Sequence, residues 1–226
     1  MININELHCG TITIAAGTPG PVSHPETRIT FSDGSSDTYE WSGEINQQTM
    51  VDAGLFGVED EMTWRRQPET VDIGNTVTSI GWSAFEYCGS LTSVMIPDSV
   101  TSIGLDAFNC CEGLTSVTIP DSVTLIGMEA FLGCTGLTGS LTIPDSVTLI
   151  GEWAFKGCGG LTSVTFNSFT KNEVKSLITS THIFGEAFTD DEWNPMEKSF
   201  TAICTDGSMT VHFSADYDAT ITFTDL

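Results

Sequence analysis

A repeated phrase of 23 residues constrains the fold of this chain more than any other feature of its sequence. Ile-Pro-Asp-Ser-Val occurs at 96–100, 119–123 and 143–147, and Gly-x-x-Ala-Phe occurs at 81–85, 104–108, 127–131 and 151–155. The period is 23 residues and rises once to 24, where Gly139 is added. Self-similarity with a period of about 20 to 50 residues is typical of repeat architectures, in which each copy buries its apolar face against the next.

Within one copy the large apolar residues alternate with polar ones, which predicts two short strands. These residues are Leu114, Val117, Ile119, Val123 and Ile126. Pro-Asp-Ser at 120–122 predicts a turn between the strands, because proline suits the second position of a turn and Asp or Ser the positions after it. Gly127 allows a second turn, and residues 128–131 then form a short helical turn. Each copy is therefore one coil of a solenoid.

We predict an α+β repeat protein, a parallel-β solenoid of 23-residue coils with non-repeat caps at both ends. The coils begin near Pro68, Leu91, Leu114, Leu137 and Leu161. Stacked coils pair as parallel strands about 4.8 Å apart. Two ladders in one register are expected in the core: Phe85, Phe108, Phe131 and Phe155; and Cys88, Cys111, Cys134 and Cys158. The seven cysteines are an odd number, and we expect mostly free thiols rather than a disulfide scaffold.

Three segments follow from this pattern: an N-terminal α+β cap (1–67), the solenoid (68–166) and a C-terminal cap (167–226). The first cap contains alternating pieces at 2–7 and 11–14, a hairpin of 28–31 with 38–41, and a helix over 46–54 with Asn46 as N-cap. The second contains a helix opened by Thr170-Lys-Asn-Glu173, a connecting loop over 183–195, a degenerate last coil over 200–211, and a hairpin joining 212–213 to 220–223.

The charge balance excludes two classes of partner. Thirty carboxylates face seven Lys and Arg, which gives a net charge of −23. Nucleic acid needs a basic surface, and so does an anionic membrane. The sequence contains no run of 18 apolar residues, the length that a membrane-spanning helix needs, so we predict no membrane insertion. The first ten residues lack the basic and apolar regions of a secretory signal, so we expect a protein not exported by that route, or a processed form.

No catalytic constellation emerges, and we predict neither an enzyme nor a cofactor. The histidines at 8, 24, 182 and 212 are scattered, and neither a zinc-protease motif nor a phosphate loop is present. The cysteine column runs along one axis and does not converge as zinc ligands would. Asp98, Asp121 and Asp145 line up at the Pro-Asp-Ser turns. We interpret them as solvated turn residues; the alternative is a Ca²⁺ site, since Ca²⁺ takes several oxygen ligands.

Two surfaces are candidates for binding. The outward strand positions form a mostly hydroxylated face, which could bind protein or glycan: Ser93, Met95, Ser116, Thr118, Ser140, Thr142, Ser163 and Thr165. Large apolar residues also occupy variable positions beside the repeat glycines: Trp82, Leu105, Met128 and Trp153. Such residues suggest contact with a partner or another subunit. The alternative for them is packing against a neighbouring coil or cap.

The phrase Leu-Thr-Ser-Val-x-Ile-Pro-Asp-Ser-Val-Thr-x-Ile-Gly-x-x-Ala-Phe-x-x-Cys resembles the BspA-like, or Treponema-type, leucine-rich repeat. The resemblance covers 68–166 and implies a curved solenoid with a non-catalytic binding role. Many members of that family are bacterial surface proteins that adhere to host matrix or to other cells. It therefore implies adhesion through a protein or glycan ligand, at the cell surface or outside the cell. The competing interpretation is a structural subunit of a virion or appendage, which could form homo-oligomers.

Overall fold

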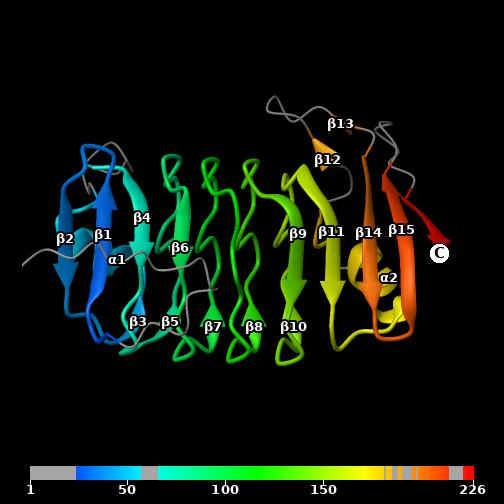
Figure 1. Ribbon diagram of the computed structural model, residues 1–226, viewed down its shortest axis with the longest axis horizontal. Coiled ribbons are helices and arrows are strands. Elements are labelled where there is room, and N and C mark those ends of the chain that lie inside the picture. Colours follow the sequence, from blue (N-terminus) through cyan, green and yellow to red (C-terminus); the bar gives the residue numbers. More distant parts are fainter. Residues whose placement is uncertain are drawn as a thin grey trace, which may run out of the picture.

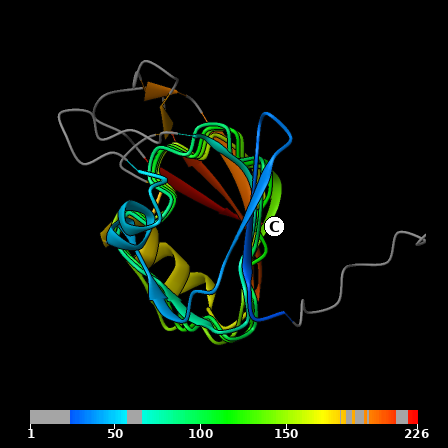
Figure 2. The ribbon, with the colours of Figure 1, turned by 90° about the vertical axis from the view of Figure 1, so that its left-hand side faces the viewer.

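The computed structural model describes residues 24–56, 66–180, 182–184, 188–189, 195–196, 198–213 and 221–226. In it the repeat coils are stacked along one axis, with a cap at each end (Figure 1). Seen along that axis, the coils superimpose as a closed outline (Figure 2). The apolar side chains buried inside it form one core cluster. This confirms the parallel-β solenoid predicted from the 23-residue period. Two sides of the solenoid carry strands, and the third consists of turns.

One strand-bearing side, which we call the front face, faces the viewer in Figure 1 and contains two sheets. The first has the order β2-β1-β4-β6, and its strands are β1 (Thr27–Phe31), β2 (Ser36–Tyr39), β4 (Pro68–Asp72) and β6 (Ser93–Met95). The second has the order β16-β15-β14-β11-β9, and its strands are β9 (Thr138–Ile143), β11 (Gly160–Phe166), β14 (Lys198–Cys204), β15 (Gly207–Phe213) and β16 (Ile221–Asp225). The neighbouring coils pair in parallel, and the caps add antiparallel strands.

The other strand-bearing side is one unbroken parallel sheet of five strands in the order β10-β8-β7-β5-β3. Its strands are β3 (Gly43–Ile45), β5 (Val77–Ile80), β7 (Ser102–Ile103), β8 (Leu125–Ile126) and β10 (Leu149–Ile150). A separate antiparallel pair is formed by β12 (Phe188–Thr189) and β13 (Pro195–Met196). The continuous sheet fixes the register of all the repeat coils.

The third side, which we call the turn flank, is held by backbone hydrogen bonds between coils. Phe108 N–H donates to the Ala130 carbonyl and Phe131 N–H to the Ala154 carbonyl, each over 2.8 Å. The glycine that opens this side in each coil allows the close approach. A Cβ on Gly127 would lie 2.5 Å from the carbonyl carbon of Gly104, closer than atoms can pack. The repeated glycine is therefore a requirement of coil stacking.

The phenylalanine ladder predicted from the repeat is confirmed. The rings of Phe85, Phe108, Phe131 and Phe155 stack with centroids 5.2–5.4 Å apart and planes within 12°. Phe184 continues the stack at 6.1 Å from Phe155 in a tilted arrangement. Ile183 and Phe184 lie in a turn at the start of the predicted connecting loop and are buried in the core. The prediction of a loop over 183–195 missed the strand pair of Phe188–Thr189 with Pro195–Met196.

The cysteine ladder lies beside the rings and is fully buried, as predicted. Three of the thiols donate to a carbonyl in the preceding coil: Cys111 to Phe85 (3.1 Å), Cys134 to Phe108 (3.2 Å) and Cys158 to Phe131 (3.3 Å). Burial raises the pKa of Cys134 well above its ordinary value. The six cysteines within the described residues are free thiols. The ladder is a buried apolar column of unreactive groups.

The front face is interrupted where the sequence predicts a strand. Residues 114–119 form no strand, although β6 and β11 carry the same Leu-Thr-Ser-Val sequence. Only the first residues of this segment bond to their neighbours: Thr115 N–H to the Thr92 carbonyl (3.4 Å) and Thr138 N–H to the Thr115 carbonyl (3.3 Å). We call this gap between β6 and β9 the seam. It separates the two sheets of the front face.

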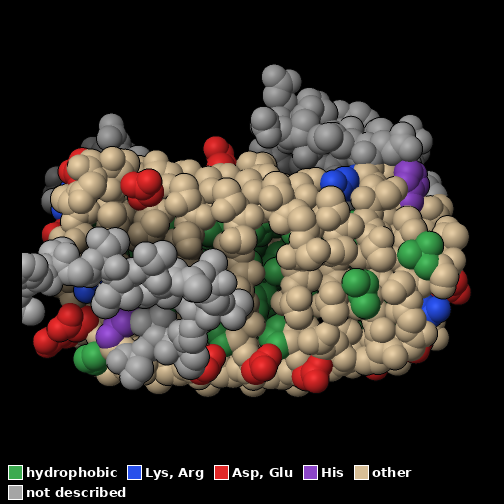
Figure 3. Space-filling view, in the orientation of Figure 1, with side chains coloured by type: hydrophobic (Ala, Val, Ile, Leu, Met, Phe, Trp, Pro, Cys, Tyr) green, Lys and Arg blue, Asp and Glu red, His purple; other side chains and the backbone are tan. Residues whose placement is uncertain are grey.

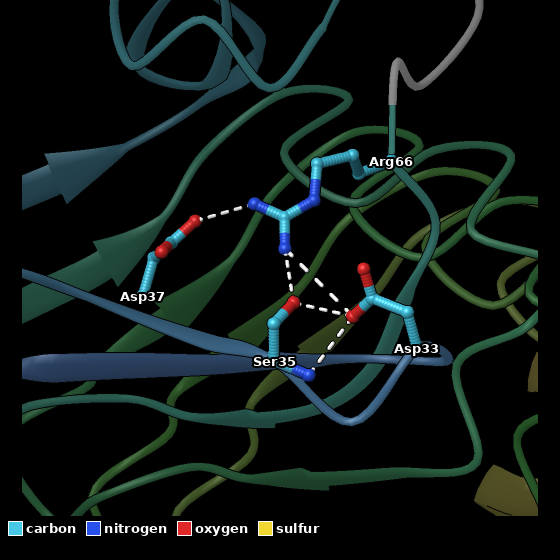
Figure 4. Close-up of polar contacts among 4 residues, drawn as sticks. All are labelled: Asp33, Ser35, Asp37 and Arg66. Atoms are coloured by element: carbon cyan, nitrogen blue, oxygen red, sulfur yellow. Dashed lines mark hydrogen bonds and ion pairs between the residues drawn. The ribbon is translucent and has the colours of Figure 1, made fainter.

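The N-terminal cap is joined to the first coil by the pairing of β1 with β4, and Arg66 holds the cap hairpin together. The predicted hairpin is present as β1 and β2, and β1 also pairs with β4. Arg66 donates to the Asp37 carboxylate (2.7 Å) and to the Ser35 hydroxyl, and it lies 3.9 Å from Asp33 (Figure 4). Its guanidinium also covers the Phe31 ring at 3.6 Å, so one side chain fixes the hairpin on two sides.

The predicted cap helix is confirmed as α1 (Gln47–Asp52), with Asn46 as N-cap and a capping box with Thr49. The pieces predicted at 2–7 and 11–14 lie outside the described residues.

The C-terminal cap differs from the prediction in one respect. The helix is confirmed as α2 (Lys171–Ser180), with Thr170 and Glu173 in a capping box. The expected last coil is wrong beyond its first strand. β14 pairs in parallel with β11, but the chain then reverses near Thr205 and returns as β15, antiparallel to β14. The predicted final hairpin is confirmed by the pairing of β15 with β16. The solenoid therefore ends in an antiparallel sheet.

Candidate binding surfaces

The hydroxylated positions predicted from the repeat all lie on the front face. Most are exposed, while Met95, Ser163 and Thr165 are half-buried. The seam divides them: Ser93 and Met95 belong to β6, the residues at 140, 142, 163 and 165 belong to β9 and β11, and those at 116 and 118 lie in the seam. Ser140 and Ser163 bond to each other through their Oγ atoms (2.7 Å). These residues therefore form two blocks instead of one flat surface.

The seam is also a hollow in the front face with an apolar floor. Figure 3 shows green hydrophobic side chains deep between the coils in the middle of this face, surrounded by tan polar surface. Val94 and Ile119 are each 6% exposed, and Ile96 and Val117 are half-buried beside them. Apolar atoms are accessible here because the strand ladder is open.

Many other hydroxyl groups of the repeat are occupied in the structure. Thr124 Oγ1 donates to the Thr101 carbonyl (3.2 Å), and Ser122 Oγ donates to the Val100 carbonyl (2.6 Å). Equivalent bonds recur in the neighbouring coils. Threonine and serine at these positions join one coil to the next, so their abundance is not by itself a sign of a ligand.

The apolar candidates on the turn flank remain at the surface. Trp82 is 48% exposed, Leu105 45% and Met128 44%. Their backbones align, since Ser83 N–H donates to the Leu105 carbonyl (2.9 Å) and Asp106 N–H to the Met128 carbonyl (3.1 Å). We call Trp82, Leu105 and Met128 the apolar stripe. Within the described part of the chain, none of the three is covered by a cap or by an adjoining coil.

Trp153, grouped with these residues by sequence, lies one position further along the chain. Glu129 N–H donates to the Glu152 carbonyl (2.9 Å), so Glu152 is the residue in register with Met128. Trp153 is half-buried at φ 57°, and Lys156 Nζ lies 4.7 Å from the centroid of its ring. Trp153 therefore flanks the end of the stripe instead of continuing it.

Carboxylates that sequence reasoning did not single out lie next to the stripe. Ser83, Asp106, Glu129 and Trp153 form the adjacent column, and Glu86 belongs to the same side. We call Glu86, Asp106 and Glu129 the acidic row. Burial, and then the charge of Asp106, raises the pKa of Glu129; burial also raises the pKa of Glu86, with Asp106 adding to the effect. Aligning the repeats would have placed Asp106 and Glu129 in one column, but not Glu86, whose position in its coil is that of Asn109.

Asn109 fixes the central carboxylate of the acidic row. It is only 7% exposed, and its Nδ2 donates to Asp106 Oδ1 (2.9 Å). Its Oδ1 is buried and has no hydrogen-bond donor among the residues that the structure describes. A carboxylate held by a buried amide loses little conformational freedom when it binds a partner.

The aspartates at the Pro-Asp-Ser turns, Asp98, Asp121 and Asp145, are all exposed. Across the described ranges, no group of three or more His, Cys, Asp or Glu side chains has a geometry that could hold a metal ion. Neither described helix could cross a membrane, since α1 has six residues and α2 has ten. His24 lies beside Asp72 (3.0 Å) and His212 beside Ser199 (2.9 Å), at opposite caps.

These features define a class of protein: a short leucine-rich-repeat solenoid whose distinctive side chains lie on open surfaces. The profile of the BspA type Leucine rich repeat region matches residues 64–183 in six copies, which is more than half of the chain. The chain belongs to the BspA-type leucine-rich-repeat family, and the resemblance predicted from the repeat phrase is confirmed. Proteins of this family generally serve as interaction modules and are generally non-enzymatic.

Solved structures of leucine-rich-repeat proteins are similar to this chain over parts of their length. The T. pallidum protein TpLRR is 25% identical, with a TM-score of 0.38, over 50% of this chain and 70% of that protein. A Bacteroides ovatus protein is 28% identical, with a TM-score of 0.35, over 64% and 40%. A leucine rich cell surface protein from Faecalibacterium prausnitzii is 22% identical, with a TM-score of 0.42, over 92% and 61%. No match is found among curated proteins.

Proposed function

We propose that this protein is a non-enzymatic interaction module that binds a protein ligand through the turn flank. The exposed apolar stripe carries the proposal. Three large apolar side chains lie in one column on adjacent coils, each close to half exposed. Contiguous apolar groups of this kind on a soluble surface mark interaction sites, and Trp and Met are enriched at protein interfaces.

The repeat provides a reason to assign recognition to this column. The inward residues of every coil are fixed by packing: the phenylalanines, the cysteines and the valines of the continuous sheet. The stripe positions make no such contribution to the core, so their identity is free to match a partner. A buried aromatic anchor is a common centre of binding energy in such interfaces.

The experiment is a binding screen against matrix proteins, cell-surface proteins and glycans, with Trp82→Ala/Met128→Ala as the test variant. Loss of at least tenfold in affinity for a bound protein is the expected result, because truncated anchor residues cost about 2 kcal/mol or more. Ser116→Ala/Thr118→Ala on the front face is the matched control. A ligand that both variants bind as well as the wild type would contradict the assignment to the turn flank.

A glycan is the second candidate, and the front face supports it. Hydroxyl groups surround an apolar hollow there, and Ser116 and Thr118 form no side-chain hydrogen bond to another residue that the structure describes. Sugars offer both hydroxyls and apolar ring faces to such a surface. In the same screen, a glycan whose binding falls with Ser116→Ala/Thr118→Ala and not with the stripe variant would identify this second function.

A structural role in an assembly is the competing proposal, and the two ends of the solenoid support it. Among the strands that the structure describes, β2 pairs only with β1 and β16 only with β15, so each cap presents an edge strand there. Edge strands can pair with another copy of the chain. Size-exclusion chromatography with light scattering tests this: a stable oligomer supports assembly, and a monomer at high concentration refutes it.

A further inference from the structure

The repeat region carries an unusual excess of negative charge. Between residues 67 and 155 the chain contains no Lys, Arg or His. The same stretch contains ten carboxylates, at Glu69, Asp72, Glu86, Asp98, Asp106, Glu112, Asp121, Glu129, Asp145 and Glu152. Lys156 is the first cation beyond it, and it lies over the Trp153 ring at the end of the stripe. The charge of Lys156 acts on Glu129 and opposes the rise of its pKa, so the acidic row has a cation near its C-terminal end, while the stretch between residues 67 and 155 contributes carboxylates and no cation.

Asp106 and Glu129 of the acidic row occupy the column next to the apolar stripe on the turn flank, and Glu86 lies three positions after Ser83, which holds that column in the first coil. Asp106 follows Leu105 directly, and Glu129 follows Met128 directly. Half-exposed apolar side chains therefore alternate with carboxylates along two coils, while Tyr87, 46% exposed, lies next to Glu86 at the N-terminal end. A partner that covers the stripe must place its own groups against the row. Once the partner covers these carboxylates, cationic groups on the partner are needed to pair with them.

The distance between neighbouring coils favours a helix over a strand as the binding element of the partner. The stacked rings beneath the turn flank lie 5.2–5.4 Å apart, which measures the repeat along the axis on this side. An α-helix advances about 5.4 Å per turn, whereas residues on one face of a strand are about 6.7 Å apart. A helix lying along the solenoid axis would therefore present one residue per turn to each coil and stay in register over several coils.

We propose that the apolar stripe and the acidic row together form a docking surface for a basic amphipathic helix of a partner protein. Leu or a similar side chain of the helix covers Trp82, Leu105 and Met128, and Lys or Arg one position away meets Glu86, Asp106 and Glu129. The inference rests on the proposed function, because it names the chemistry of the ligand that the stripe binds. Asn109 supports it by holding the central carboxylate in place before binding.

The test uses the full chain and a fluorescein-labelled synthetic peptide of about 15 residues, roughly four helical turns. The peptide has Leu at every third or fourth position and Lys beside each Leu. Fluorescence anisotropy measures its dissociation constant for the wild type, for Glu86→Gln/Asp106→Asn/Glu129→Gln and for Asp98→Asn/Asp121→Asn/Asp145→Asn. The two triple variants change the net charge equally, but the second set lies at the Pro-Asp-Ser turns. Circular dichroism first establishes that both variants are folded.

We expect the acidic-row variant to bind the peptide about tenfold more weakly, since each exposed ion pair contributes modestly and three are removed. The turn variant is expected to bind within twofold of the wild type. A peptide of the same composition in scrambled order, which has no amphipathic face, is expected to bind at least tenfold more weakly than the ordered peptide. Equal weakening in the two triple variants would overturn the inference, because attraction would then come from the overall charge.

Two further outcomes separate this inference from the proposed function. If the screen finds a protein ligand that depends on Trp82 and Met128 but binds the acidic-row variant normally, the docking function stands and the basic helix is wrong. If the peptide binds through the acidic row while Trp82→Ala/Met128→Ala has no effect on it, the stripe is not the anchor and the proposed function fails with the inference.

Discussion

The close approach of the coils at the repeat glycines yields a sharp prediction: Gly127→Ala should destabilise the protein strongly. Gly127 does not have a positive φ, so alanine can adopt its backbone conformation without strain. The obstacle is the neighbouring coil, because the new Cβ would lie 2.5 Å from the Gly104 carbonyl carbon and 2.7 Å from Leu105 N. These are backbone atoms, which cannot move aside as a flexible side chain would.

The magnitude follows from the displacement that alanine requires. Carbon atoms pack at about 3.5–4.0 Å, so the two coils must separate by about 1 Å. Gly127 N–H donates to the Ile103 carbonyl over 2.8 Å, and Asp106 N–H donates to the Met128 carbonyl over 3.1 Å. An added 1 Å takes both beyond hydrogen-bonding distance. Two lost bonds at about 1 kcal/mol each, with overpacking of about 1–3 kcal/mol, give a loss of about 3–5 kcal/mol.

Differential scanning calorimetry measures the effect, and Gly89→Ala is the matched control. A Cβ on Gly89 meets nothing within 4 Å, and Glu112 and Thr135 occupy the equivalent positions in the next coils. For a chain of this size each kcal/mol shifts the melting temperature by about 2–4 °C, so Gly127→Ala should lower it by roughly 10 °C. Gly89→Ala should leave it unchanged or slightly raised. Equal melting temperatures for the two variants would refute the reasoning about coil spacing.

Two more predictions concern the core and the acidic row. Phe131→Ala removes a fully buried ring stacked on both sides and should cost about 3–5 kcal/mol in urea unfolding, whereas an unchanged midpoint would show that the ladder is not the core. Burial raises the pKa of Glu86 in the folded state, so the native protein binds more protons than the unfolded chain, and stability falls as pH rises through this pKa. Glu86→Gln should therefore raise the melting temperature at pH 7 by about 1–2 °C and leave it unchanged at pH 3; a lower value at pH 7 would contradict the burial effect.

The repeat phrase was sufficient to predict those parts of the fold that depend on residues one period apart. Phe131 stacks on Phe108 because both occupy the same place in their coils, and the register of the cysteines follows from the same rule. The seam could not be predicted in this way. Residues 114–117 repeat the sequence of 91–94, yet β6 finds a partner in β4, while the segment after Leu114 bonds to its neighbours only at Thr115 and forms no strand. Strand pairing depends on both partners, so one local sequence has two outcomes.

The binding surfaces, too, could be predicted from the sequence only in part. The exposure of Trp82, Leu105 and Met128 follows from their variable positions. Trp153 was predicted to belong with them as a large apolar residue near a repeat glycine, but it stands two positions after Gly151, and the backbone register places Glu152 in the column instead. The acidic row was hidden because 30 carboxylates in the sequence make any single one unremarkable. Only the structure shows that Asp106 lies between two carboxylates and is fixed by Asn109.

The seam has a mechanical consequence. The parallel sheet from β3 to β10 and the turn flank run without interruption through the middle coils, while the front face loses its strand ladder between β6 and β9. A rod bonded continuously on two sides and open on the third has its lowest bending stiffness at the opening. We expect the solenoid to bend there, with β2-β1-β4-β6 and β9-β11-β14 as two stiff arms. Its curvature can then adjust to a partner at a single joint.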